Sequence, residues 1–175
     1  MGGFDYNIVL IGFMGTGKST VSEYLSARFA MRTVEMDQVI AEREKMSIPE
    51  IFAVHGEEYF RDLETGLLVE MQSHKNTVIS CGGGAALREK NVVQMKKNGK
   101  VVLLTASPET VYERVKNSEG RPVLDGRKNV KGILELMEQR WDRYEAAADI
   151  VVNTDNKTVP QVCEELVQRL MEIEE

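Results

Sequence analysis

The sequence has few of the residues that mark disulfide-bonded, metal-binding or nucleic-acid-binding proteins. Its 175 residues include only two cysteines and two histidines. Cys81 and Cys163 share no short motif, which argues against a disulfide framework or a zinc site and predicts reduced, buried thiols. His55 and His74 are isolated, without the spacing of metal ligands. The formal net charge of -6 argues against a nucleic-acid partner, because a long footprint on nucleic acid needs a basic face.

Long apolar runs and a secretion signal are also missing. No apolar stretch approaches the ~20 residues that cross a bilayer. The first residues, MGGFDYNIVLIG, lack the basic region and cleavage site of a signal peptide. We therefore expect a cytoplasmic protein that does not contact a membrane. The hydrophobic share of 42% and charged share of 29% are ordinary for a globular protein, and the length predicts one domain over residues 1–175.

Strand-like and helix-like patterns alternate along the chain. Short apolar runs predict strands at residues 6–12, 32–36, 77–81, 100–106 and 149–153, the second being the weakest. Apolar residues at helical spacing occupy the stretches between them, and the longest such stretches are 57–71 and 130–147. This alternation is typical of an α/β fold. We expect a five-stranded parallel sheet flanked by helices on both faces, with the ligand outside the carboxyl ends of the strands.

A glycine-rich stretch follows the first expected strand. Residues 12–19 read GFMGTGKS and match the pattern G-x-x-x-x-G-K-[ST] between a strand and a helix. In such a P-loop the backbone N–H groups converge on phosphate oxygens at a helix N-terminus. Lys18 would neutralise the β- and γ-phosphates, and Ser19 would bind Mg²⁺. The pattern predicts a nucleoside triphosphate site, with the contacts Gly12, Gly15, Thr16, Gly17, Lys18, Ser19 and Thr20.

Two features of the sequence limit the kinds of nucleotide-binding protein that it can be: the absence of a guanine-reading motif and the position of two acidic residues. Residues 156–159 read NKTV and lack the aspartate of the guanine-reading motif N-K-x-D, so guanine specificity is unsupported. Glu35 and Asp37 lie at the expected end of the second strand. Because residues two apart in an extended segment point to the same side, both acids are candidates for the magnesium shell.

Three arginines are candidates for anion binding, because a guanidinium fork suits carboxylates and phosphates. Arg61 precedes Glu64 by three residues, so the two can pair along a helix. Arg121 lies in a polar segment broken by glycine and proline, and Arg140 lies in the expected long helix. Taken alone, each is better explained as a surface residue. Their meaning depends on whether the fold brings them together.

Six segments follow one another along the chain: GFMGTGKST, EMDQVIAE, SIPEIFAVHGEEYFRDLE, VISCGGGAAL, GRPVL and EQRWDRYEAAADIVVNT. Taken in this order, they resemble the shikimate kinase family along nearly the whole chain. It implies a P-loop fold of the nucleoside-monophosphate-kinase type, with a mobile lid at about residues 116–128. It also implies transfer of the γ-phosphate of ATP to the 3-hydroxyl of shikimate, with Mg²⁺, on the route to chorismate and the aromatic amino acids. The resemblance suggests a monomer or weak dimer.

The resemblance further implies roles for individual residues. Asp37 would hold the shikimate hydroxyls and orient or deprotonate the nucleophile. Arg61 and Arg140 would clamp the shikimate carboxylate, with Glu64 steadying Arg61. Arg121 would move with the lid toward the phosphates. The remaining implied contacts are Gly82, Gly83 and Gly84 on the shikimate side, and Arg114 and Lys157 on the adenine side.

Two positions depart from the family pattern, and two alternatives stay open. The family usually has Asp-x-Asp where this chain has Glu35 and Asp37; we expect the longer Glu35 to support Mg²⁺ together with Ser19. An arginine often stands where this chain has Lys157, and a lysine lacks guanidinium stacking. The alternatives are a related small-molecule kinase, such as one acting on gluconate, and a non-catalytic nucleotide-binding relative.

Overall fold

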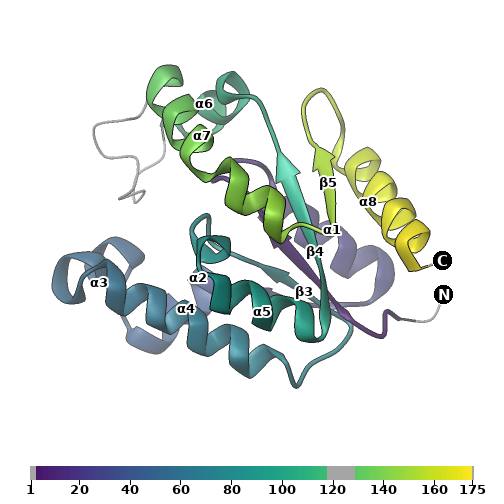
Figure 1. Cartoon of the computed structure of the whole chain (residues 1–175), viewed down its shortest axis with the longest axis horizontal. Helices are drawn as coiled ribbons and strands as arrows, with labels where there is room; N and C mark the ends of the chain where they lie inside the picture. Colours follow the sequence, from purple (N-terminus) through teal and green to yellow (C-terminus); the bar gives the residue numbers. More distant parts are fainter. Residues whose placement is uncertain (1–2, 118–128, 175) are drawn as a thin grey trace.

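The structure, a computed structural model, describes residues 3–117 and 129–174 and contains a five-stranded parallel sheet (Figure 1). The strands are β1 (Asn7–Ile11), β2 (Arg32–Glu35), β3 (Thr77–Ser80), β4 (Gly99–Thr105) and β5 (Ile150–Asn153), in the spatial order β2-β3-β1-β4-β5. The helices are α1 (Lys18–Phe29), α2 (Met36–Glu44), α3 (Ile48–His55), α4 (Glu57–Met71), the 3₁₀ turn η1 (Ala85–Leu87), α5 (Glu89–Lys97), α6 (Pro108–Val115), α7 (Val130–Ala147) and α8 (Val159–Glu174). The predicted α/β fold with five parallel strands is confirmed.

Strand β1 is the centre of the sheet. It pairs in parallel with β3 on one side and β4 on the other, so that Val9 lies opposite both Ile79 and Val101. All five of its residues are buried. A strand covered on both faces needs apolar side chains at successive positions, which explains its unbroken apolar run. The edge strand β2 exposes Arg32 and Thr33, and its apolar pattern is correspondingly weak.

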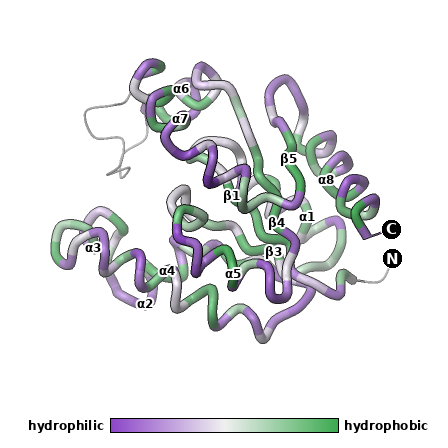
Figure 2. Tube along the Cα trace, viewed as in Figure 1, coloured by the Kyte–Doolittle hydropathy of each residue, from purple (hydrophilic) through white to green (hydrophobic). Residues whose placement is uncertain are grey.

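Alternate residues of β1 belong to two separate apolar cores. Ile8 and Leu10 lie in one core, with buried side chains of α1 and α8. Val9 and Ile11 lie in the other, with buried side chains of α4, α5 and α7. Helices therefore cover both faces of the sheet, and Figure 2 shows the apolar strands between helices whose outer residues are hydrophilic.

The carboxyl ends of the three strands β1, β2 and β3 lie side by side. Glu35, the last residue of β2, is in register with Ser80, the last residue of β3. The next residue, Cys81, donates its backbone N–H to the carbonyl of Leu10 in β1, at 3.0 Å. The P-loop at 12–19 leaves β1 at the same edge. One edge of the sheet thus gathers the P-loop, the acidic end of β2 and the glycine run after β3.

The prediction that Glu35 and Asp37 share one extended segment is wrong. Strand β2 ends at Glu35 and helix α2 begins at Met36, so Asp37 lies in the first turn of a helix. Two physical reasons favour the turn at this point. Met36 is fully buried in the core next to the sheet, and a carboxylate in the first turn is stabilised by the helix dipole.

Two further expectations concern the lid and the membrane. The lid expected at about residues 116–128 lies outside the described residues, except for its first two. No helix in the described part of the chain is long and apolar enough to cross a bilayer.

The packing of α8 predicts the effect of truncating its buried face. Leu166 is fully buried against the sheet, whereas Met171 on the same helix is 53% exposed. We expect Leu166→Ala to lower the free energy of unfolding by about 2–5 kcal/mol, because it leaves a cavity in a packed core. Met171→Ala should change it by no more than about 0.5 kcal/mol. Urea titration followed by circular dichroism measures both; equal losses would contradict the described packing.

Candidate active site

A cavity of about 760 Å³ opens at the carboxyl edge of the sheet. Its wall is built from the P-loop, the start of α2, helix α4, the glycine run after β3, and helices α6 and α7. The predicted site residues that line it are Gly15, Gly17, Lys18, Ser19, Thr20, Glu35, Asp37, Arg61, Glu64, Gly82, Gly83, Gly84, Arg114 and Arg140. Residues from the first and last thirds of the chain therefore face the same space.

Three predicted residues of the described ranges do not line this cavity. Gly12 and Thr16 belong to the body of the P-loop, where the Thr16 hydroxyl donates to the carbonyl of residue 13 at 2.8 Å. Lys157 forms an ion pair with Glu165 of α8, with its Nζ 3.2 Å from the carboxylate. Arg121 lies outside the described residues, so its role stays a prediction.

The P-loop is bent around the side chain of its own lysine. Gly12 has φ of +142°, and a Cβ atom there would lie 2.4 Å from the carbonyl oxygen of Leu104. Gly17, with φ of +98°, lets the chain enter α1 at Lys18. Lys18 Nζ donates to the carbonyls of Gly12, at 2.7 Å, and Phe13, at 3.0 Å. The loop and the N-terminus of α1 together form the kind of backbone cradle that binds phosphate.

Two oxygen donors beside this cradle fit a magnesium ion. The Ser19 hydroxyl donates to Glu35 Oε2 at 3.0 Å, so the longer acid of this chain reaches the serine directly. Hydroxyl and carboxylate oxygens are the ligands that Mg²⁺ takes, and it usually completes its shell with phosphate and water. In the ranges 3–117 and 129–174, no group of three or more His, Cys, Asp or Glu could hold a metal ion. The pair therefore suits an ion that arrives with a nucleotide.

Helix α4 brings a buried carboxyl group and an arginine to the cavity. Arg61 donates to Glu64 Oε1 at 2.8 Å and to Glu57 Oε1 at 3.1 Å. Glu64 is fully buried, and this burial raises its pKa to about 7 although Arg61 acts in the opposite direction. Its second oxygen, Oε2, is buried without a hydrogen-bond partner in the described part of the chain. The guanidinium of Arg61 thus has two carboxyl partners, whereas only one of the two carboxyl oxygens of Glu64 has a hydrogen-bond partner in the described structure.

The glycine run after β3 is explained by the side chains that press against it. A Cβ atom on Gly82 would lie 2.8 Å from Asp37 Oδ1 and 3.0 Å from Glu64 Oε2. A Cβ atom on Gly84 would lie 2.4 Å from Arg61 Nη1. Neither glycine has a positive φ, so the backbone conformation does not require glycine here; a larger residue would instead displace the charged ends of these side chains. Asp37, Glu64 and Arg61 therefore converge on this turn.

Helix α7 contributes Arg140, whose surroundings differ from those of Arg61. Its side chain is buried, and its guanidinium carbon lies 5.6 Å from the centre of the Phe13 ring in the P-loop. Its Nη1 donates to the hydroxyl of Tyr144 at 3.4 Å. Within the described ranges Arg140 forms no ion pair with a carboxylate. Arg140 thus brings an uncompensated positive charge to the cavity.

Sequence reasoning missed the apolar part of the wall. Ile48, Phe52 and Phe60 line the cavity beside the charged residues, and the two phenylalanine rings lie 5.1 Å apart. Apolar residues at helical spacing read as ordinary core positions, so the sequence carried no separate signal for them. Met14 of the P-loop also lines the cavity, and it was missed because it occupies a variable position of the P-loop pattern. This wall gives the cavity one apolar side against which a carbon ring can pack.

The fold and the site together define a P-loop kinase for a small molecule. The triphosphate cradle faces a second pocket that contains a carboxylate, Asp37, and two arginines. Such a pocket suits an acceptor that carries hydroxyl groups and a negative charge.

Comparisons with known proteins identify the particular family. The family model "Shikimate kinase" matches residues 14–171. A shikimate kinase of Persephonella marina is 43% identical over 164 residues, covering 94% of this chain and 98% of its own. Another, from Dehalococcoides mccartyi, is 42% identical over 168 residues, covering 96% and 95%. A structure of shikimate kinase from Acinetobacter baumannii in complex with shikimate superposes with a TM-score of 0.90 at 29% identity, covering 95% and 93%.

The chain belongs to the shikimate kinase family. Its full-length relatives make it a shikimate kinase, an ATP-using enzyme of the shikimate pathway. The relatives named above give no support to the alternative of a gluconate-type kinase.

Because burial raises the pKa of Glu64, we expect the stability of the protein to depend on pH. The pKa of Glu64 is raised to about 7 in the folded protein, so folding favours the protonated carboxyl group. The contribution of Glu64 to the free energy of unfolding is therefore complete at low pH and is lost as pH rises toward and through 7. We expect the stability of the wild type relative to Glu64→Gln to fall by about 2 kcal/mol between pH 5 and pH 8. Urea unfolding at both pH values measures the difference.

A matched control is Glu70→Gln on the same helix. Hydrogen bonding to Arg43 lowers the pKa of Glu70, so its carboxylate is ionised throughout this range and the relative stability should be flat. A flat profile for Glu64→Gln as well would show that Glu64 is ionised in the folded protein.

Proposed function

We propose that this enzyme transfers the γ-phosphoryl group of ATP to the 3-hydroxyl of shikimate, and that Asp37, Arg61 and Arg140 bind the acceptor. The observation that carries these roles is the convergence of Asp37, Arg61 and Arg140 on the glycine turn 82–84, beside the P-loop. An anionic acceptor bound there lies next to the triphosphate, which is the alignment that phosphoryl transfer chiefly requires.

Arg140 and Arg61 bind the acceptor carboxylate. Arg140 supplies the net attraction, since its charge has no carboxylate partner in the described structure, whereas Arg61 is already paired with Glu57 and Glu64. Arg61 adds directed N–H donors from a fixed position. The apolar wall beside them suits the carbon ring of the acceptor.

Asp37 holds the acceptor hydroxyls and receives the proton of the 3-hydroxyl. The 3-oxygen then forms a bond to the γ-phosphorus as the bond from that phosphorus to the β,γ-bridging oxygen breaks, which leaves ADP and shikimate 3-phosphate. Lys18 leaves the loop carbonyls and compensates the charge on the phosphates. Ser19, with Glu35 in support, would hold Mg²⁺, which would supply further positive charge at the triphosphate.

Several finer points belong to this proposal. Gly15, Gly17 and Thr20 contact the phosphates. Arg114, which donates to the carbonyl of Gly15 at 2.7 Å, lies on the adenine side, and its exposed position at the cavity supports this role. Lys157 helps on that side only if it leaves Glu165. Arg121 approaches the phosphates from the lid, and the active form is a cytoplasmic monomer.

A coupled assay of ADP release tests the acceptor. We compare shikimate, gluconate and no acceptor at fixed ATP and Mg²⁺, and identify the product by ³¹P NMR. Turnover that depends on shikimate and yields a single 3-phosphate ester supports the proposal. Turnover only with gluconate supports the sugar-acid alternative, and no acceptor-dependent release supports a non-catalytic relative.

Removing the charge of Asp37 tests its role as base. Asp37→Asn keeps the shape and the ability to hydrogen-bond but accepts no proton. We expect kcat to fall by about 10²–10⁴-fold, the usual share of a general base, with ATP binding nearly unchanged. Steady-state kinetics and nucleotide titration measure the two quantities. A near-normal kcat would remove Asp37 from the chemistry.

Replacing the fork of Arg140 by a point charge tests the carboxylate clamp. We expect Arg140→Lys to raise the KM for shikimate by about tenfold to a hundredfold, with a smaller change in kcat and in the KM for ATP. Exposed Arg143→Lys on the same helix serves as control. An unchanged KM for shikimate in Arg140→Lys would place Arg140 outside acceptor binding.

A further inference from the structure

Tyr144 lies one helical turn after Arg140 on α7, and its hydroxyl connects two parts of the site. The hydroxyl donates to the carbonyl of Gly83 and accepts from Arg140 Nη1 at 3.4 Å. The direction of both bonds is fixed, because a carbonyl only accepts and a guanidinium only donates. Tyr144 is 3% exposed and Arg140 is 8% exposed, so water cannot easily take the place of either partner.

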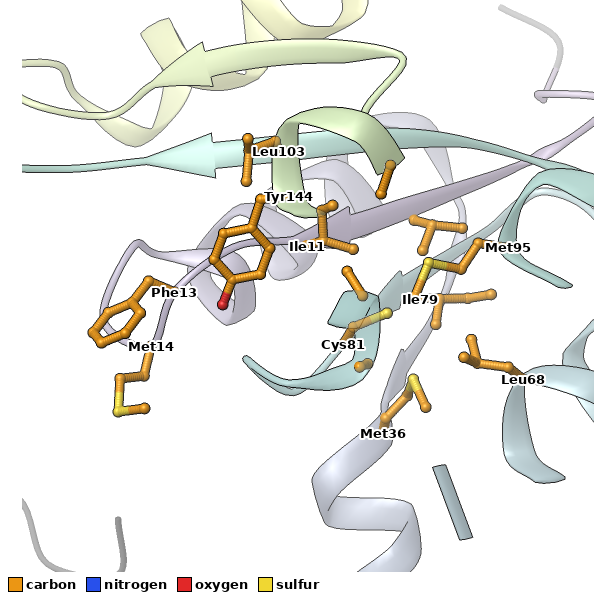
Figure 3. Close-up of a cluster of buried hydrophobic side chains, with 14 of the residues drawn as sticks. Ile11, Phe13, Met14, Met36, Leu68, Ile79, Cys81, Met95, Leu103 and Tyr144 are labelled. Atoms are coloured by element: carbon orange, nitrogen blue, oxygen red, sulfur yellow. The ribbon is translucent and has the colours of Figure 1, made fainter. Parts of the chain in front are cut away.

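The two groups that Tyr144 joins lie close to each other and to the P-loop. A Cβ atom on Gly83 would lie 3.4 Å from Arg140 Nη1 and 3.6 Å from the backbone nitrogen of Met14. In Figure 3 the Tyr144 ring belongs to the apolar cluster that includes Ile11 and Phe13, and its hydroxyl is drawn at the end directed away from Leu103. A rigid ring thus holds one oxygen at the junction of the arginine, the glycine turn and the loop.

A phenol is suited to this position because it orients a cation without neutralising it. A carboxylate beside Arg140 would compete with an anionic acceptor, as Glu64 does beside Arg61. Burial raises the pKa of Tyr144, although Arg140 opposes this shift, so the hydroxyl keeps its proton and remains a donor to Gly83. Arg140 is therefore held in place and still carries its full charge.

We propose that Tyr144 is a positioning residue for the acceptor, which fixes the guanidinium of Arg140 and the Gly83 turn in the geometry that binds the acceptor carboxylate. This inference rests on the proposed function. Tyr144 acts through Arg140 and Gly83 and does not itself touch the acceptor. Its role is distinct from filling the core, since the ring alone would do that.

The test removes the hydroxyl and keeps the ring. In Tyr144→Phe we expect the KM for shikimate to rise by about fivefold to tenfold, the effect of one ordinary hydrogen bond, with kcat and the KM for ATP changed less than about twofold. The matched control is Tyr6→Phe, which removes another buried hydroxyl, just before β1 at the opposite end of the sheet. It should leave all three constants unchanged.

The methyl ester of shikimate lacks the negative charge of the acid. The preference of the enzyme for shikimate over this ester is a ratio that partial unfolding of a variant does not change. Wild type should prefer shikimate to the ester, and Tyr144→Phe should lose most of this preference by weakening only the acid. All constants are measured at least ten degrees below the melting temperature of each variant. An unchanged preference, or a fall in kcat with both KM values unchanged, would overturn the proposal.

The double variant Tyr144→Phe/Arg140→Lys separates this proposal from the proposed function. If Tyr144 acts through Arg140, its loss should add less than about twofold to the KM of Arg140→Lys. Fully multiplicative effects would mean that the two residues act independently, which contradicts the proposal. Absence of shikimate-dependent turnover in the wild type would instead overturn the proposed function itself.

Discussion

The site depends on the parallel alignment of three strand ends. Because β1 lies between β3 and β4, the P-loop leaves the sheet directly beside the glycine run that follows β3. The bond from the Cys81 backbone to Leu10 fixes these two ends against each other, and the contact of Gly12 with the Leu104 carbonyl fixes the loop against β4. A shift of register by one residue would separate the cradle for the donor phosphate from the pocket for the acceptor. Binding and alignment therefore follow from the same backbone pairing.

The two arginines of the proposed acceptor pocket differ in how far their positive charges are neutralised by neighbouring carboxylates. Arg61 has two carboxylate partners and contributes geometry at little net charge, whereas Arg140 is oriented by a neutral hydroxyl and an aromatic ring. The buried carboxyl of Glu64 bears the cost of this arrangement, since one of its oxygens has no hydrogen-bond partner in the described structure. A pocket that placed a carboxylate beside both arginines would leave less net positive charge to attract an anion.

The fold and the donor side could be read from the sequence because their signals are local. The alternation of apolar patterns and the eight residues of the P-loop each specify one structure within a short window. The acceptor side is assembled over long distances: Arg61 and Arg140 looked like surface residues until the fold joined them, and only the family resemblance related them. Tyr144 fits helical spacing as a core residue, and its partner Gly83 lies 61 positions away. The assumption of an extended segment failed at Asp37, because β2 ends at Glu35 and α2 begins at Met36.

The close approach of Arg61 to Gly84 restricts which residues can evolve at position 84. No side chain fits at position 84 while the guanidinium of Arg61 occupies the place where its first carbon would be. A lineage that gained a side chain at 84 would first have to move or lose the arginine, and with it the proposed ligand of the acceptor carboxylate. The dependence runs one way, because loss of Arg61 leaves Gly84 free of any clash.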